Sequence, residues 1–143
     1  GILFGGVFID FIDVNSIESS GVSNIISDSI IKVNNLEIEL EGAGSANLNI
    51  EVSKLEVDIK GAGIVEISGN VDFNDIDISG AGIFKGHNLI TRKTEIEISG
   101  ASKAYVNASD ILDVEITGAS EVKYAGNPAV KQKISGVGVL IKE

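Results

Sequence analysis

Ten acidic residues recur at regular intervals along this chain of 143 residues and form its clearest candidate for a functional surface. They fall into two series, two residues apart in each repeat: Glu37, Glu56, Asp75, Glu95 and Asp113, and Glu39, Asp58, Asp77, Glu97 and Glu115. Carboxylates in such a pattern attract cations or a basic partner, or simply keep a surface solvated. Ca²⁺ takes six to eight oxygen ligands, and a flat series offers only a few per site. We therefore expect weak, diffuse cation binding rather than a caged ion.

A glycine-containing tripeptide follows each pair of acidic residues and sets the spacing of the two series. Its copies are Gly42-Ala43-Gly44, Gly61-Ala62-Gly63, Gly80-Ala81-Gly82, Gly100-Ala101-Ser102 and Gly118-Ala119-Ser120, with a relaxed copy at Gly136-Val137-Gly138. The leading glycines are 19, 19, 20, 18 and 18 residues apart, and Gly21-Val22-Ser23 is a candidate degenerate copy upstream. Self-similarity at a short fixed period is typical of a solenoid, in which each repeat buries its apolar face against the next.

Aliphatic residues alternate with the acidic ones before each tripeptide and return after it. Two residues before the leading glycine stand Leu40, Ile59, Ile78, Ile98, Ile116 and Ile134, and four residues after it stand Ala46, Val65, Phe84, Ala104, Val122 and Leu140. Alternation with a period of two predicts strands with one buried face and one face in water. Each repeat is thus predicted to be a strand, a sharp corner, a second strand and a variable stretch. Turns are expected there at 69–70, 86–88 and 126–128, with room for a short third strand.

These patterns predict an all-β fold, a right-handed parallel β-helix of about six to seven rungs with a repeat of ~19 residues. Glycine supplies the positive φ or the space that a sharp corner requires, and only small side chains fit where corners stack at roughly 4.8 Å. The length predicts one domain over 1–143, with an irregular first rung or cap in 1–30 and regular repeats in 31–143. In the last rung Lys131 and Lys133 replace acidic residues, which predicts a protected C-terminal end.

The fold places like charges of each acidic series on adjacent strands. Two carboxylates roughly 4.8 Å apart repel by about 1 kcal/mol in water and by about 3–4 kcal/mol at an effective dielectric constant near 20. We therefore expect relief from salt, from raised pKa values or from bound cations.

Other features exclude several classes of function. The net charge of −10 argues against binding nucleic-acid phosphates, and the absence of cysteine excludes disulfides and thiolate metal sites. No apolar run reaches the roughly 20 residues of a membrane-spanning helix. His87 is the only histidine, and no nucleophile-elbow sequence accompanies it, so we predict no catalytic residues and no cofactor. Because the chain begins with Gly1 rather than Met, we expect a fragment from which any signal peptide is already missing.

The repeats and the C-terminal segment resemble one known family. The motifs are IDISGAG at 76–82, IEISGAS at 96–102, VEITGAS at 114–120 and the ending YAGNPAVKQKISGVG at 124–138. They are similar to the putative auto-transporter adhesin, head GIN domain family, over roughly residues 30–143. Its members are mostly secreted or surface proteins of Bacteroidetes. The resemblance implies a β-helix at the cell envelope, in a secreted, periplasmic or cell-surface location. It implies no catalytic residues.

Two classes of function remain. The first is a non-catalytic binding or structural module at the cell envelope, adhesin-like, that meets a glycan, a protein or cations through its acidic face. The second is an enzyme that acts on polysaccharide with carboxylates on the face of the β-helix. An enzyme should show a walled cleft in which two carboxylates converge, whereas a binding module should show smooth, uniform faces. Association of copies through their ends or faces is a further expectation.

Overall fold

The computed structural model describes the fold of residues 2–4, 7–9, 15–19, 24–27 and 29–143, and every regular element in those ranges is a β-strand. The strands are β1 (Ile2–Phe4), β2 (Val7–Ile9), β3 (Ser16–Ser19), β4 (Asn24–Ser27), β5 (Ile31–Gly42), β6 (Ser45–Gly61), β7 (Ile64–Gly80), β8 (Ile83–Gly100), β9 (Lys103–Gly118), β10 (Glu121–Ala125), β11 (Ala129–Gly136) and β12 (Val139–Lys142). Together they form one continuous 12-stranded sheet.

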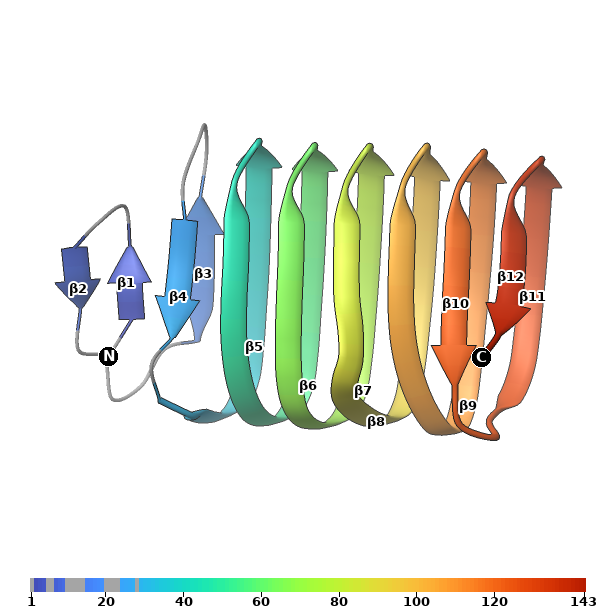
Figure 1. Ribbon diagram of the computed structural model, residues 1–143. Helices are drawn as coiled ribbons and strands as arrows, with labels where there is room; N and C mark the ends of the chain where they lie inside the picture. The colour runs from blue at the N-terminus through green and yellow to red at the C-terminus, as the bar shows by residue number, and fades with distance from the viewer. Residues whose placement is uncertain (1, 5–6, 10–14, 20–23, 28) are drawn as a thin grey trace.

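The sheet is wound into stacked coils, as the repeat predicts. Each long strand leaves a corner, runs along one side, bends, and returns along the other side to the next corner (Figure 1). Strands β5 to β9 pair with their neighbours in parallel, one repeat apart. The chain descends on the near side, rises on the far side and advances to the right in Figure 1, so the coil is right-handed. The predicted right-handed β-solenoid is confirmed, with about six turns.

The variable stretches differ from the prediction. We expected turns at 69–70 and 86–88, but both lie inside long strands, β7 and β8, that bend without interruption. The glycines there accompany register shifts between β7 and β8 and between β8 and β9, so they mark bulges rather than chain reversals. The third predicted turn is present, because Gly126-Asn127-Pro128 separates β10 from β11.

The corners show why the tripeptide carries glycine. Gly61 has a φ of +104°, and a Cβ atom on it would lie 2.6 Å from the carbonyl oxygen of Gly42, one turn away. That carbonyl accepts a hydrogen bond of 2.8 Å from the amide of Ala62, so the corners bond to one another along the axis. Where serine ends the tripeptide, its hydroxyl joins this network: Ser102 Oγ donates to the carbonyl oxygen of Gly80 at 3.1 Å.

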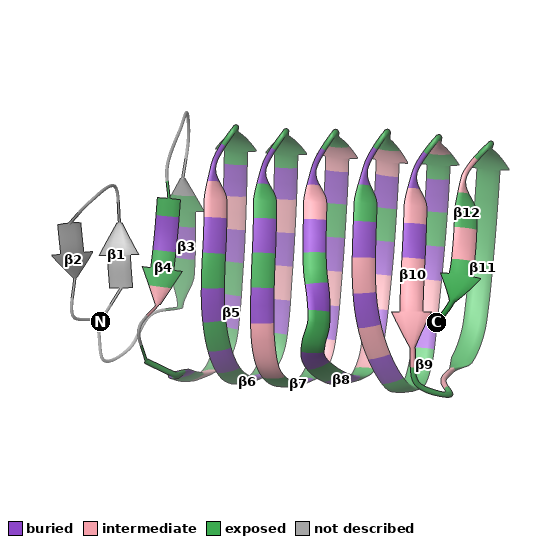
Figure 2. Ribbon diagram, in the orientation of Figure 1, coloured by how far each residue is buried: buried purple, intermediate pink, exposed green. Residues whose placement is uncertain are grey.

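The predicted apolar columns form the core between the two sides of the coil (Figure 2). The column two residues before each corner is buried as far as Ile116, while Ile134 in the last turn is 39% exposed. A further inward column at the bend contains Leu36, Leu55, Asn74, Thr94 and Leu112, so polar side chains interrupt an otherwise aliphatic stack.

The N-terminal segment combines two arrangements in its described parts. Strands β3 and β4 pair in parallel with β5 and β6 and continue the coil, whereas β1 pairs antiparallel with β4 and β2 (Figure 1). The candidate corner at 21–23 lies outside the described residues. The boundaries proposed for a single domain, with a cap in 1–30, stay a prediction.

Candidate functional site

The structure places the ten predicted acidic residues in two straight rows on one side of the coil. One row follows the register through Glu37, Glu56, Asp75, Glu95 and Asp113, and the other runs through Glu39, Asp58, Asp77, Glu97 and Glu115. The rows lie on the limbs of β5 to β9 that rise to the corners, on the far side in Figure 1. We call this surface the acidic face. Whether it binds anything stays a prediction.

Glu18 is a member of the acidic face that the sequence analysis missed. It lies opposite Glu39 in the pairing of β3 with β5 and extends the second row by one turn. A signal was present in the sequence, because Glu18 stands three residues before Gly21 of the candidate degenerate copy, as Glu39 stands three residues before Gly42.

Three carboxyl groups of the acidic face have raised pKa values, and desolvation is the largest cause for each of them. Partial burial raises the pKa of Asp75, and the charges of Glu95 and Glu56 add to the effect. Burial and the charge of Asp58 likewise raise the pKa of Asp77, although Lys60 acts in the opposite direction. The pKa of Glu39 is also raised, by desolvation first, while the charge of Lys60 lowers it and the acidic neighbours raise it further. Raised pKa values were one of the three expected forms of relief.

Lysine side chains beside the rows reduce the repulsion between the carboxylates, an arrangement that was not predicted from the sequence. Lys54 Nζ lies 3.0 Å from Glu56 Oε1, and Lys93 Nζ lies 3.2 Å from Glu95 Oε1. Both lysines also contact the Phe73 ring, which lies between them in the register. At the C-terminal end the register sets Lys131 beside Asp113 and Lys133 beside Glu115, so each row ends in a cation.

The acidic face is open to solvent. A depression of about 160 Å³ on it is lined by Val57 and five carboxylate side chains, those of Glu37, Glu56, Asp58, Asp75 and Asp77. Among the residues that the structure describes, no group of three or more acidic or histidine side chains is arranged to hold a metal ion. Along each row the carboxylates follow the parallel register from one strand to the next.

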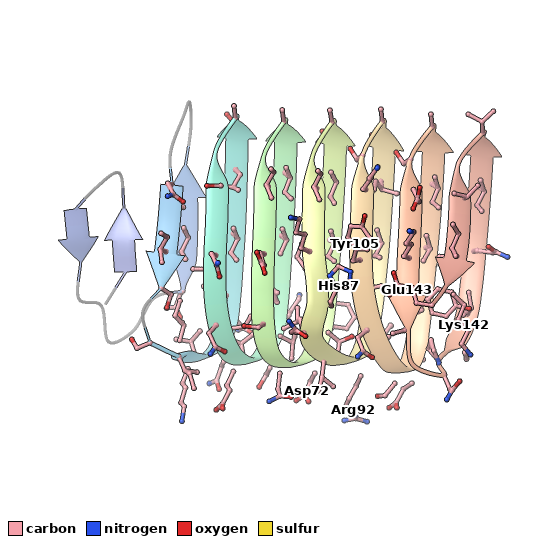
Figure 3. All side chains as sticks on the ribbon, in the orientation of Figure 1. Asp72, His87, Arg92, Tyr105, Lys142 and Glu143 are labelled. Atoms are coloured by element: carbon pink, nitrogen blue, oxygen red, sulfur yellow. The ribbon has the colours of Figure 1, made fainter. Side chains whose placement is uncertain are left out.

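A second surface, not foreseen from the sequence, is a groove of about 740 Å³ along the bend of the coil. It crosses β5 to β8, reaches β9 at Ser109, and is lined by Lys32, Val33, Asn34, Glu51, Val52, Ser53, Asn70, Val71, Asp72, Ile90, Thr91, Arg92 and Ser109. We call it the bend groove. Asp72 and Arg92 project from the bend at the bottom of Figure 3. An adjoining hollow of about 880 Å³ shares Lys32, Val33 and Asn34 with it and extends to Glu37 and Glu56.

The bend groove is not evident from the sequence, because the variable stretches resemble separate turns there. Asn34, Ser53, Asp72 and Arg92 occupy the same position of successive repeats but share no residue type, so no pattern in the sequence marks them.

His87, the only histidine of the chain, is part of an aromatic pair. Its ring stacks on Tyr105, with the centroids 4.4 Å apart (Figure 3). The ammonium of Lys123 lies 5.9 Å from the centre of the same tyrosine ring. His87 thus occupies the bulge of β8 as a packing partner of the next turn.

Comparison with known proteins agrees with this geometry. The family model of the putative auto-transporter adhesin, head GIN domain, matches residues 6–128. The chain belongs to this family. A comparison with curated proteins found no match. No element in the described part of this head GIN domain is a helix long and apolar enough to cross a membrane.

Solved structures share the fold of this head GIN domain. A putative adhesin from Parabacteroides distasonis has a TM-score of 0.88 at 27% identity, over 90% of this chain and 55% of its own. A putative adhesin from Bacteroides fragilis has a TM-score of 0.80 at 27% identity, over 90% of this chain and 59% of its own. A putative lipid binding protein from Parabacteroides distasonis has a TM-score of 0.83 at 28% identity, over 90% of this chain and 52% of its own. The chain thus spans little more than half the length of these structures.

Proposed function

We propose that this head GIN domain is a non-catalytic, adhesin-like binding module at the cell envelope that presents its acidic face to a partner. The observation that carries the proposal is the register, which holds two rows of carboxylates in line across β5 to β9. A rigid, regular row of charge matches a partner with repeated basic groups or a layer of cations. The family name and the adhesin names of the similar structures support the same class of function and a secreted or cell-surface location.

The partner that we propose is a glycan or a protein at the cell surface, and the name of one similar structure adds a lipid as a third class to test. Cations are part of the proposal as weak, exchangeable ligands. The two rows offer few oxygens per site, whereas a tight calcium site encloses its ion with six to eight. Ca²⁺ would then bridge the acidic face to an acidic partner or screen its repulsion.

A polysaccharide-acting enzyme is the alternative. The open acidic face weighs against it, since glycoside hydrolysis requires two carboxyl groups that flank the scissile bond. Incubation with acidic and neutral polysaccharides, followed by an assay for new reducing ends, separates the two functions. Turnover that is lost in a carboxylate-to-amide variant would replace the binding proposal with catalysis.

A binding screen tests the proposed module directly. The immobilised domain is presented with matrix proteins, glycans and lipid vesicles, with and without millimolar Ca²⁺. We expect binding to a member of this panel to weaken in Asp77→Asn, which removes one charge from the acidic face. Glu66→Gln is the matched control, because Glu66 is equally exposed but lies on the opposite limb of β7. Equal loss in the two variants would reject the acidic face as the binding surface.

A further inference from the structure

We propose that the bend groove binds a segment of uncharged polysaccharide whose chain runs parallel to the axis of the solenoid. This inference deepens the proposed function and rests on it, since it names a ligand class and a second surface for a binding module. It depends on the shape of the groove, on its charge balance and on polar side chains that have no partner within the protein.

The strand geometry gives the groove a floor and two walls. Its floor is the backbone of Val33, Val52, Val71 and Thr91, whose side chains point inward and are mostly buried. The residues before and after each floor residue point outward. One wall therefore consists of Lys32, Glu51, Asn70 and Ile90, which are register partners, and the other of Asn34, Ser53, Asp72 and Arg92.

This construction selects an elongated ligand. Each turn adds one side chain to either wall, and turns follow one another at roughly 4.8 Å, the spacing of adjacent strands. The groove keeps the same floor and walls across four strands, β5 to β8, and ends at Ser109 of β9. A ligand that uses its whole length must itself be extended and repetitive.

The charges of the groove balance, in contrast to the rest of the protein. Two cations, Lys32 and Arg92, and two carboxylates, Glu51 and Asp72, line it, although the chain carries a net charge of −10. Lys32 Nζ lies 3.6 Å from Glu51 Oε2, and Arg92 Nε lies 3.3 Å from Asp110 Oδ2. These cations are therefore already paired, and the groove offers no excess positive charge to a sulfated or uronic-acid polymer. The charge balance favours an uncharged ligand.

The remaining polar side chains suit hydroxyl groups. In the described part of the chain, the side chains of Asn34, Ser53, Asn70 and Asp72 make no hydrogen bond or ion pair within the protein. Amides, a hydroxyl and a carboxylate supply both donors and acceptors, which is what neighbouring hydroxyls on a sugar ring require. Ile90, which is 55% exposed in the same wall, offers an apolar surface to the carbon-bound hydrogens of the ring.

An extended peptide fits this groove less well. Peptides that dock on sheets in an extended form add a strand to a free edge and use main-chain hydrogen bonds. The floor lies in the middle of the ladder, where Val52 is flanked by Val33 on one side and Val71 on the other. The main-chain groups of the floor already form the ladder hydrogen bonds between turns, so recognition must come from the side chains of the walls.

The test measures binding of uncharged polysaccharides by affinity electrophoresis, with dextran, β-glucan, galactomannan and chito-oligosaccharides as probes and heparin as the charged comparison. At least one uncharged probe should retard the domain, and heparin should not. Asn70→Ala and Asp72→Ala, one from each wall, should each weaken that binding by about tenfold, the effect of one lost hydrogen bond to a ligand. Ser53→Trp should block the groove.

Asn47→Ala is the matched control, because Asn47 is an exposed outward residue of β6 on the near side of the coil. It should bind as the unchanged domain does. If no uncharged probe binds, or if Asn70→Ala and Asp72→Ala bind as tightly as Asn47→Ala, the inference is overturned, even where Ser53→Trp fails to fold. The proposed module survives that failure if a partner from the wider screen still depends on Asp77.

Discussion

The ammonium of Lys93 lies 5.2 Å from the centre of the Phe73 ring and 3.2 Å from Glu95 Oε1. On the other side of the same ring, Lys54 lies 5.7 Å from its centre and 3.0 Å from Glu56 Oε1. One half-buried aromatic ring on β7 thus contacts a lysine on the turn before it and a lysine on the turn after it, and each lysine pairs with a glutamate of the acidic row that starts at Glu37. Lys54 and Lys93, which are register partners of Phe73, therefore reduce the repulsion between carboxylates of the acidic face.

Phe73→Ala should destabilise the domain by about 1–2 kcal/mol, because each cation–π contact contributes roughly 0.5–1 kcal/mol at an exposed site. Phe73→Leu is the control that keeps apolar bulk and removes the ring electrons. Urea unfolding of both variants measures the difference. If Phe73→Leu is as stable as the unchanged domain, the ring acts by packing alone and the lysines do not depend on it.

Replacement of Asp77 and Glu97 by Asn and Gln should leave the domain equally stable or more stable by about 1 kcal/mol, since the two charges face each other on adjacent strands. At constant ionic strength, millimolar Ca²⁺ and Mg²⁺ should raise the melting temperature of the unchanged domain to a similar small extent. The double variant should respond less. Equal melting temperatures with and without the cations would reject cation relief, and a loss of stability in the variant would reveal contacts made by these side chains.

The pH dependence of stability should carry the signature of raised carboxyl pKa values. Asp75 and Asp77 bind protons more tightly in the folded state than at their ordinary pKa of 3.8, mainly because burial disfavours the charged form. Their favourable contribution is complete below that value and is lost as the pH rises through the raised pKa. The double variant Asp75→Asn, Asp77→Asn should therefore be more stable than the unchanged domain at pH 7, and the difference should vanish below about pH 3, where both carboxyl groups are protonated in the folded and the unfolded state. A difference in melting temperature that is the same at both pH values would contradict this account.

The repeat made the coil predictable, because a period of about 19 residues with alternating aliphatic positions admits few other folds. Counting from Gly61 and Gly80 placed Asp58 beside Asp77 correctly, since a parallel ladder preserves the position within a repeat. The bends were not predictable in the same way. Gly69 and Gly86 resemble turn residues in sequence, and only the neighbouring strands decide that the chain bulges there instead.

The bend groove and the contacts of Lys54 and Lys93 with Phe73 were not predicted, for a related reason. Both depend on side chains of different types at equivalent positions, such as Lys54, Phe73 and Lys93, so no residue type recurs to mark them. The acidic rows were visible because the same chemistry returns in five successive turns.

Gly100→Ala should be among the most damaging single substitutions. Gly100 has a φ of +84°, and an added Cβ would lie 2.4 Å from the carbonyl oxygen of Gly80, which also accepts a hydrogen bond from Ala101. Backbone strain of this kind amounts to about 1–3 kcal/mol, and the clash adds to it. Ala101→Ser, at the exposed tip of the same corner, is the control and should leave the melting temperature unchanged. If Gly100→Ala has the same melting temperature as Ala101→Ser, the backbone of the corner can move enough to accommodate the added Cβ atom.

Asn74 is the least expected member of the core, and its replacement by leucine should stabilise the domain. The side chain is fully buried in the inward column between Leu55 and Thr94, and neither its amide nitrogen nor its oxygen has a hydrogen-bond partner. A buried polar group without a partner costs about 1–3 kcal/mol, and Asn74→Leu removes that cost with little change in size. By contrast, the hydroxyls of Thr91 and Thr94 in the next turn pair at 2.6 Å.

Thermal and urea unfolding of Asn74→Leu should show a gain of about 1–3 kcal/mol. Leu55→Asn, the reverse exchange one turn earlier in the same column, should lose about 2–5 kcal/mol, because it removes buried apolar atoms and adds an unpaired amide. If Asn74→Leu is less stable than the unchanged domain, the amide must be satisfied in solution by an ordered water held inside the coil. The pair of variants separates these cases, because only a site built around a polar group makes both exchanges destabilising.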